Sequence, residues 1–315
     1  MQLGDEKEIK RIVKEFMSRN KKIKINVRSE FEIQLLIEDL RHEHTLLFHV
    51  GEIRYKFYPR HAEAFLYPEY IMPELEYQDN IASLLREVDR IRGLFRTGMS
   101  QIQIEQGVHD YLCQHITYAE DDVQSHSVVG PILRGRGVCD GISKTAKMLF
   151  QVLGVEAHVI DGMAKNMASF SYEPHAWNLI RINQRWYHLD ITFDNTISGN
   201  SIRYDYFNLS DKEILKDHVK GNIILFTEIE CRDEKDYYLS NGLCFSNEAL
   251  LKEYLKGQLR KRTSGTIQLR TTEDIAEESV LSIFERCLRE NGGKVSYTES
   301  VNSVRGVFMW EVLFE

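Results

Sequence analysis

The sequence predicts an α+β protein in which a central region of helices and antiparallel strands is flanked by two small β-α-β-β modules. Apolar residues recur at helical spacing after Val138, whereas residues 155–160, 176–182 and 186–192 have the apolar runs typical of strands. Both ends of the chain show the order strand, helix, strand, strand. The chain has 315 residues, of which 43% are apolar, so it can form two or three domains.

The first domain is expected at residues 1–78. Ser29 is a predicted N-cap, and Glu32 follows three residues later as in a capping box. Gly51-Glu52 is a predicted turn between two strands. The helices are expected at 5–19 and 30–43, and the strands at 22–27, 46–50, 53–58 and 65–72. Because neither this region nor the C-terminal one carries a chemical motif, we interpret both as docking or substrate-presenting modules.

The central domain is expected at residues 79–262 and the third domain at 263–315. In the central domain, besides the strands named above, helices are predicted at 79–94, 101–115, 211–219 and 247–260, and further strand pieces at 116–118, 227–232 and 235–238. In the third domain, strands are predicted at 266–270, 294–299 and 306–314 around a helix at 273–290. Residues 25–34 and 267–276 align loosely, which indicates a duplicated flanking module.

Composition excludes several classes of protein. The net charge of −8 argues against non-specific nucleic-acid binding, which needs a cationic surface. No apolar run approaches the length of a membrane span, and the charged helical start is unlike a signal peptide, so we expect a cytoplasmic protein with no membrane contact. The five cysteines have no regular spacing, so neither a disulfide framework nor a paired-cysteine metal site is predicted. Four of them are expected to be buried, inert thiols: Cys113, Cys231, Cys244 and Cys287.

Three residues in the central region are candidates for thiol chemistry. Cys139 lies at the start of a predicted helix that ends before Gly154, and a helix start favours an anion, so its thiol is easier to ionise. Gly137 and Gly141 indicate close backbone approach beside it. His175 opens a strand that is joined by a short turn to the strand carrying Asp190, so the two residues lie within about two positions of being opposite. A histidine near the thiol completes a thiolate–imidazolium pair, and a carboxylate on its far nitrogen orients the ring.

These motifs resemble those of the transglutaminase-like superfamily of papain-like thiol enzymes. The residues that carry the resemblance are GVCDG at 137–141, HAW at 175–177 and WYHLD at 186–190, with intervals of 36 and 15 residues between Cys139, His175 and Asp190. The similar segment runs roughly from Val108 to Thr196. The resemblance implies a papain-like core, in which helices with the cysteine at a helix start pack on an antiparallel sheet.

The resemblance also implies a function. Cys139 would be the nucleophile, His175 the general base and acid, and Asp190 the residue that orients the histidine. We expect a cysteine peptidase, deamidase or acyltransferase that forms a thioester with a protein or peptide, with hydrolysis favoured over amine transfer. The competing hypothesis is a catalytically silent interaction module that binds a protein partner. No cofactor is expected, and the sequence does not indicate the oligomeric state.

Two features of the site stay open at this level. The backbone N–H of Cys139 is one expected oxyanion donor, and the second comes from Gln124 or from the His126-Ser127 pair. His188 is expected to be an exposed or supporting residue, and Trp177 and Trp186 to shield the imidazole. An open zinc site is disfavoured because no HExxH or paired Cys/His spacing is present. Its possible ligands are His158, Asp161, His175, His188 and Asp190.

Overall fold

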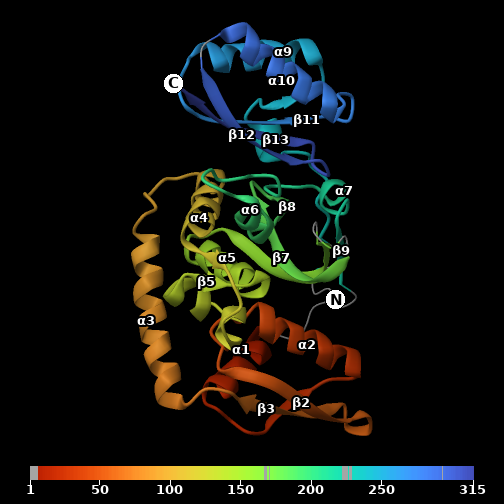
Figure 1. Ribbon diagram of the computed structural model, residues 1–315. Coiled ribbons are helices and arrows are strands. Elements are labelled where there is room, and N and C mark those ends of the chain that lie inside the picture. Colours follow the sequence, from red (N-terminus) through yellow and green to blue (C-terminus); the bar gives the residue numbers. More distant parts are fainter. Residues whose placement is uncertain (1–5, 167–168, 170, 222–225, 227–228, 293) are drawn as a thin grey trace.

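The chain forms three regions that follow one another from end to end (Figure 1). The structure is a computed structural model that describes residues 6–166, 169, 171–221, 226, 229–292 and 294–315. Helices and mostly antiparallel sheets occur in all three regions, which confirms the predicted α+β class. Over the described residues, no helix combines the length and the apolar character needed to cross a membrane.

The N-terminal module packs two helices on a three-stranded antiparallel sheet of order β1-β3-β2. Ser29 caps the second helix as predicted, because its side chain accepts a hydrogen bond from the N–H of Glu32 at 3.2 Å. The predicted turn at Gly51-Glu52 is wrong, since these residues lie inside one strand with an irregularity between Val50 and Ile53. The elements are α1 (Glu6–Met17), β1 (Ile23–Asn26), α2 (Glu30–His42), β2 (Val50–Tyr58), the 3₁₀ turn η1 (Pro59–His61) and β3 (Glu63–Tyr70).

The C-terminal module repeats the same succession of helix, strand, helix, strand, strand. Its last strand lies between the other two long strands, as it does in the N-terminal module. The shared topology agrees with the duplication that the alignment indicated and extends it by one helix. The elements are β10 (Cys244–Phe245), α9 (Glu248–Arg260), β11 (Gly265–Thr271), α10 (Glu277–Asn291), β12 (Val295–Asn302) and β13 (Val307–Phe314).

Helix α9 belongs to the core of the C-terminal module. Its buried leucines Leu251, Leu255 and Leu259 pack in one apolar cluster with Phe284 of α10 and Trp310 of β13. The predicted boundary at 262/263 therefore cuts this cluster. Amphipathic spacing predicted the helix but did not show which core it covers, and we propose that the module begins near residue 243.

The central region packs α5 against one face of a four-stranded antiparallel sheet of order β8-β7-β6-β9. Its helices are α3 (Glu74–Arg92), α4 (Gln101–His115), α5 (Cys139–Val152), α6 (Ile191–Ile197), α7 (Asp211–Ile214) and α8 (Tyr237–Ser240), with short turns η2 (Val123–His126) and η3 (Gly130–Arg134). Its strands are β4 (Thr117–Tyr118), β5 (Arg136–Gly137), β6 (Glu156–Lys165), β7 (Tyr172–Ile182), β8 (Arg185–Leu189) and β9 (His218–Lys220).

Three predictions after the site region are wrong. The helix predicted at 211–219 is a single turn, α7, and the chain then forms β9. Residues 227–228 of the strand piece predicted at 227–232 lie outside the described residues, and 229–232 do not form a strand. The piece predicted at 235–238 enters helix α8 instead.

The β7–β8 hairpin has the predicted turn. Asn183 and Gln184 both have positive φ, 50° and 66°, as a tight hairpin turn requires. Asn178 pairs with Leu189 and Ile182 with Arg185, so the strand register centres the hairpin on these two turn residues. The side chains of β8 alternate: Tyr187 and Leu189 join the main core, whereas His188 faces the opposite side of the sheet with Trp177.

Glu43, at the end of α2, anchors the N-terminal module to the central region. Lys147 of α5 donates to its carbonyl oxygen at 2.7 Å and pairs with its carboxylate at 3.2 Å. His158 of β6 lies 3.1 Å from the same carboxylate. Because Lys147 is almost fully buried, this contact fixes the module against the back of the helix that begins at Cys139.

Candidate active site

Cys139 is the first residue of α5, as predicted, and is half-buried. Its N-cap residue, Val138, makes no side-chain hydrogen bond to this helix start. The neighbouring glycines permit the close approach that the sequence indicated: a Cβ at Gly137 would lie 2.6 Å from Pro131, and one at Gly141 would overlap the carbonyl oxygen of Ser125. The thiol therefore sits where the loop before α5 presses against the first turn of the helix.

His175 lies on β7, opposite Gly162 of β6. Its Nε2 is 2.7 Å from Oδ2 of Asp190, and the ring is almost fully buried, stacked beside Trp177 with 6.1 Å between the ring centroids. Burial alone would lower the pKa of His175. The carboxylate of Asp190 and then the sulfur of Cys139 outweigh burial and raise this pKa to about 10. Since Asp190 occupies Nε2, Nδ1 is the ring nitrogen left for the Cys139 sulfur.

Asp190 follows β8 and caps helix α6, which corrects the prediction of a strand through residue 192. Its Oδ1 accepts the N–H of Phe193 at 3.1 Å, so the carboxylate starts a helix with one oxygen and binds His175 with the other. Asp190 is fully buried. Burial would raise its pKa, but His175 and a second histidine, His218, hold the pKa of Asp190 far below its ordinary value.

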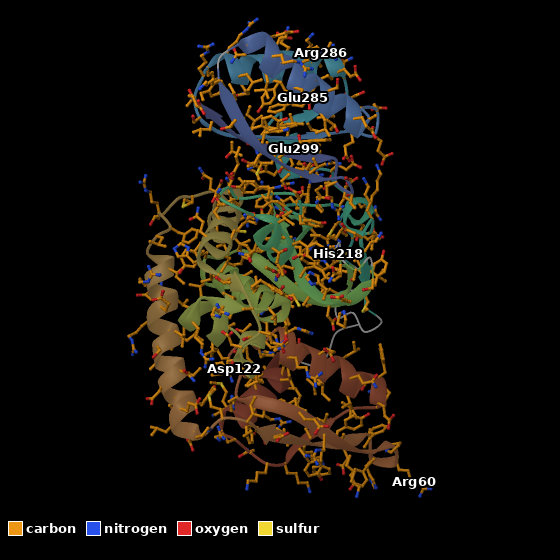
Figure 2. The ribbon with its side chains drawn as sticks, in the orientation of Figure 1. Arg60, Asp122, His218, Glu285, Arg286 and Glu299 are labelled. Carbon is orange, nitrogen blue, oxygen red and sulfur yellow. The ribbon has the colours of Figure 1, made fainter. Side chains whose placement is uncertain are left out.

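His218 is a site residue that sequence reasoning missed. Its Nε2 lies 3.0 Å from Oδ2 of Asp190, the oxygen that also binds His175. His218 lies on β9 in the central region (Figure 2), where Ala164 of β6 is its strand partner. No spacing rule joins residue 218 to the three motifs, because an antiparallel pairing between distant segments brings it to the site.

His188 has a supporting role, one of the two that the sequence left open. The indole N–H of Trp177 donates to its Nδ1 at 3.0 Å, and its Nε2 lies 3.0 Å from Asp211. Burial lowers the pKa of His188 to about 4, so the ring is neutral near pH 7, with its hydrogen on Nε2. This pair fixes the indole that stacks beside His175.

Gln124 is buried in the turn η2, beside the start of α5. The hydroxyl of Ser127 donates to its side-chain oxygen at 2.9 Å, and the N–H of Val138 donates to the carbonyl of Ser125 at 3.1 Å. His126 points away from this arrangement, since it is exposed and lies 3.2 Å from Glu120. The loop thus presents the amide of Gln124, rather than the His126 ring, from its buried side.

A cleft of about 470 Å³ opens beside His175. The central region supplies the ends of β6 and β7 and the helix α6, and the C-terminal module supplies part of β12. The lining residues are Tyr118, Ala164, Lys165, Asn166, Glu173, Pro174, His175, Thr192, Phe193, Thr196, Ile197, Arg203, Tyr206, Ser300, Val301 and Asn302.

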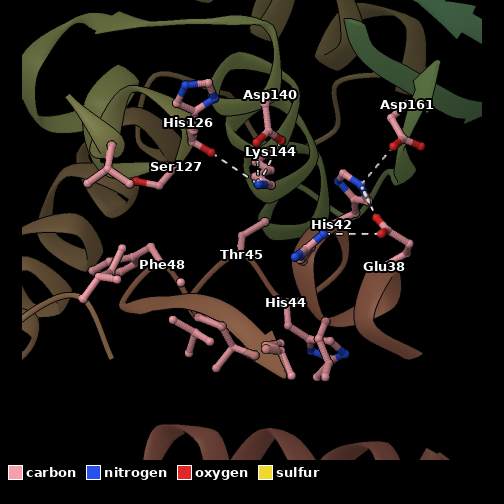
Figure 3. A pocket seen from close by; sticks show the side chains of 18 residues that line it. Glu38, His42, His44, Thr45, Phe48, His126, Ser127, Asp140, Lys144 and Asp161 are labelled. Atoms are coloured by element: carbon pink, nitrogen blue, oxygen red, sulfur yellow. Dashed lines mark hydrogen bonds and ion pairs between the residues drawn. The ribbon is translucent and has the colours of Figure 1, made fainter. Parts of the chain in front are cut away.

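A second cavity, of about 390 Å³, lies between the N-terminal module and the start of α5 (Figure 3). On its α5 side, Lys144 lies 2.8 Å from Asp140 and donates to the carbonyl of His126 at 3.3 Å. On the other side, His42 of α2 lies 3.2 Å from Glu38 and 3.9 Å from Asp161. The cavity borders the residue that follows Cys139 and does not include Cys139 itself.

Three groups of described residues place potential metal-ligating atoms within 4.8 Å of one another. They are His175, Asp190 and His218; His188, Asp211 and Cys231; and Glu38, His42 and Asp161. Of the residues that the sequence offered as zinc ligands, only His175 and Asp190 fall in the same group as each other; His188 and Asp161 each belong to a different group. Hydrogen bonds of 2.7 and 3.0 Å to a single carboxylate oxygen account for the spacing of that group.

Comparison with known proteins identifies the central region. Residues 89–191 match the family model described as the transglutaminase-like superfamily. The chain therefore contains a transglutaminase-like domain, and this domain carries the cysteine, histidine and aspartate described above.

Each match spans only part of this chain and only part of the similar protein. Kyphoscoliosis peptidase of mouse is 26% identical over 163 residues, which span 46% of this chain and 24% of the mouse protein. A crystal structure of a TGase is 17% identical, with a TM-score of 0.30, over 54% of this chain and 51% of the other. A candidate cysteine protease from Cytophaga hutchinsonii is 14% identical, with a TM-score of 0.32, over 54% of this chain and 65% of the other.

Proposed function

We propose that the protein is a cysteine-dependent amide hydrolase or acyltransferase that acts on a protein or peptide through a thioester. One observation carries the proposal: the His175 ring is bound to Asp190 at 2.7 Å through Nε2, while its remaining side interacts with Cys139 at a helix start. A thiol, an imidazole and a carboxylate in this order are the groups that nucleophilic acyl transfer requires.

The reaction would follow from these positions. The Cys139 thiolate attacks the amide carbonyl carbon, and the carbonyl oxygen becomes an oxyanion. The protonated His175 then gives its Nδ1 hydrogen to the departing amine as the C–N bond breaks, which leaves a thioester. Water or an amine next attacks the thioester, His175 accepts its proton, and the Cys139 sulfur leaves. We favour water, because nothing in the sequence indicates an amine-acceptor site.

The oxyanion would be stabilised by the backbone N–H of Cys139 and by the side-chain amide of Gln124. The uncapped start of α5 leaves the first of these donors available. Ser127 fixes the oxygen of the Gln124 amide, so its NH₂ group is the end that can donate. Both donors belong to the loop and the helix turn that meet at Gly141.

Gln124→Ala is therefore expected to lower kcat about 10²-fold with little change in KM, since the lost hydrogen bond forms to the oxyanion. Hydrolysis of fluorescein-labelled casein would measure both constants. The matched control is Gln101→Ala, which removes a glutamine amide at the β7–β8 turn, where its oxygen accepts the N–H of Asn183. Equal kcat in Gln124→Ala and wild type would remove Gln124 from the site.

The proposal is tested by the alkylation of Cys139 with iodoacetamide at pH 6, compared between wild type and His175→Ala. A free thiol is mostly protonated at pH 6, whereas a thiol paired with an imidazolium reacts as the thiolate. Fast labelling of Cys139 in wild type, lost in His175→Ala, is expected. His61→Ala, which removes an exposed histidine of the N-terminal module, should label like wild type.

The other cysteines provide internal controls in the same sample. Burial raises the pKa of each of their thiols, to about 12 for Cys231, so none should react at pH 6; the four are Cys113, Cys231, Cys244 and Cys287. Peptide mass spectrometry distinguishes them from Cys139. If Cys139 labels slowly and equally in wild type and His175→Ala, the proposal of a thiol enzyme is wrong. The competing hypothesis, a partner-binding module, is then favoured.

A further inference from the structure

We propose that Arg305 of the C-terminal module is a positioning residue of the thiol site: through Asp217 and His218 it holds Asp190, and it supplies a positive charge that balances the Cys139 thiolate. The inference rests on the proposed function. It assigns a role in the reaction to a module that lies outside the transglutaminase-like domain.

A continuous series of contacts links Arg305 to Asp190. The guanidinium of Arg305 binds Oδ1 of Asp217, and the same oxygen lies 2.7 Å from Nδ1 of His218. Nε2 of His218 then lies 3.0 Å from Asp190. All four side chains are at most 3% exposed, so water does not weaken these contacts.

Each member of the series is held from more than one side. Arg305 lies in the turn between β12 and β13, donates to the carbonyl of Glu213, and stacks its guanidinium over the Tyr206 ring at 4.6 Å. The hydroxyl of Tyr206 donates to the second oxygen of Asp217 at 2.8 Å. Asp217 therefore has little freedom to rotate, and it fixes the direction in which His218 points.

The orientation of His218 sets its role. Both of its ring nitrogens face carboxylate oxygens, which only accept hydrogen bonds, so both contacts are satisfied when each nitrogen carries a hydrogen. In that form His218 donates to the same oxygen of Asp190 that receives His175. Asp190 is thus held by two rings and by the start of α6.

The charges of the series balance only when Arg305 is included. With a thiolate at Cys139 and a hydrogen on each His218 nitrogen, the series has three negative groups, Cys139, Asp190 and Asp217, and three positive groups, His175, His218 and Arg305. Glu213, whose carboxylate lies 3.9 Å from Arg305, is balanced by Lys216 and Arg270. Removal of Arg305 leaves one uncompensated negative charge, which is costly in a buried site. The group that can relieve this cost by taking a proton is the thiolate, because the two carboxylates remain hydrogen-bonded.

Arg305 is not the only contact that docks the C-terminal module. Arg203 of the central region donates to Ser300 of β12 at 2.8 Å, and Arg270 of β11 pairs with Asp236 at 2.5 Å and with Glu213 at 3.3 Å. Arg270 is only partly buried, with 17% of its side chain exposed, but it pairs with buried carboxylates as Arg305 does and has no contact with Asp217 or His218. Arg270→Met is therefore the matched control for a loss of docking.

The experiment measures the iodoacetamide rate of Cys139 at pH 6 in the full chain, below the melting temperature of each variant. We expect Arg305→Met to lower the rate about tenfold or more, because small displacements of catalytic groups have large effects. Arg305→Lys keeps the charge and should recover most of the rate, and Arg270→Met should match wild type. Arg305 is not among the described residues that line the cleft beside His175. The KM for casein should therefore not change.

A second variant tests the route and guards against misfolding of Arg305→Met. His218→Phe keeps the ring among Trp177, Phe193 and Tyr206 but removes both N–H groups. It should lower the rate like Arg305→Met, and the double variant should be no slower than either single variant, since both act through one path. If Arg305→Met does not fold, the same decision is read from His218→Phe compared with Arg270→Met.

The outcomes separate the two proposals. If wild-type labelling depends on His175 but Arg305→Met and His218→Phe label like Arg270→Met, this inference is overturned and the proposed function stands. A fall in Arg305→Met that Arg305→Lys does not recover also overturns it, because charge is then not what Arg305 supplies. If wild-type labelling does not depend on His175, the proposed function fails and the inference fails with it.

Discussion

Replacing Cys139 with alanine is expected to lower amide turnover by about 10⁴-fold or more, because no other group in the site can form the thioester. The chain should remain folded, since Cys139 is only half-buried and the first turn of a helix accepts alanine. Hydrolysis of labelled casein measures turnover, and the release of nitrophenolate from p-nitrophenyl acetate reports whether the enzyme becomes acylated.

Cys113→Ala is the control for the loss of a thiol. Cys113 lies on α4, and its sulfur is 3.8 Å from His109, in a partly buried pair that does not involve His175. The variant should retain the acylation burst that Cys139→Ala loses. A burst that persists in Cys139→Ala would show that another residue is the nucleophile.

Asp190→Asn is expected to lower turnover by about 10⁴-fold, the effect seen when an orienting carboxylate becomes an amide. Asparagine remains a good cap for α6, so the helix should persist. Without the carboxylate, burial dominates and the pKa of His175 falls, so the ring becomes neutral near pH 7. Labelling of Cys139 at pH 6 should therefore fall along with turnover.

The same substitution should change how stability depends on pH. The pKa of His175 is raised to about 10, so its ion pair stabilises the wild type fully below the unfolded value near 6.5. That contribution is lost as the pH rises through about 10. Melting temperatures between pH 7 and pH 11 should decline more steeply in wild type than in Asp190→Asn.

Asp194→Asn is the matched control, because Asp194 is equally buried and belongs to the same helix. Its carboxylate lies 3.1 Å from His109 rather than from His175. Burial raises the pKa of Asp194 to about 7, so its carboxyl group is partly protonated near pH 7. The change to an amide therefore removes less negative charge than it does at Asp190. It should alter stability and leave Cys139 labelling at the wild-type rate; equal losses in both variants would contradict an orienting role specific to Asp190.

Local patterns were sufficient to predict the parts of the site that neighbouring residues determine. Helix α5 begins at Cys139 because apolar spacing and flanking glycines specify it, and Gly154 ends it with a φ of 78°. The hairpin turn sets the register between the strands of His175 and Asp190. For the helix start, the helix end and the hairpin, residues within about twenty positions along the chain determine the structure.

The remaining features depend on distant contacts. Asp190 was expected on a strand, because the apolar alternation through Ile191 masked its role as a helix cap. His218 reaches the site only because β9 pairs with β6, and Gly162 has no side chain to block that approach. Helix α9 has an apolar stripe that fits either neighbouring core, so only packing decides which one it joins.

The C-terminal module gives the protein a functional boundary that differs from its recognisable one. The segment that matches the family model ends at residue 191, whereas the hydrogen-bonded site extends to His218 and, through Asp217, to Arg305. A fragment cut to the recognisable segment would keep all three motif residues but lose one of the two rings that hold Asp190. Distant homologues that share the motifs can therefore differ in reactivity through residues that a motif search never compares.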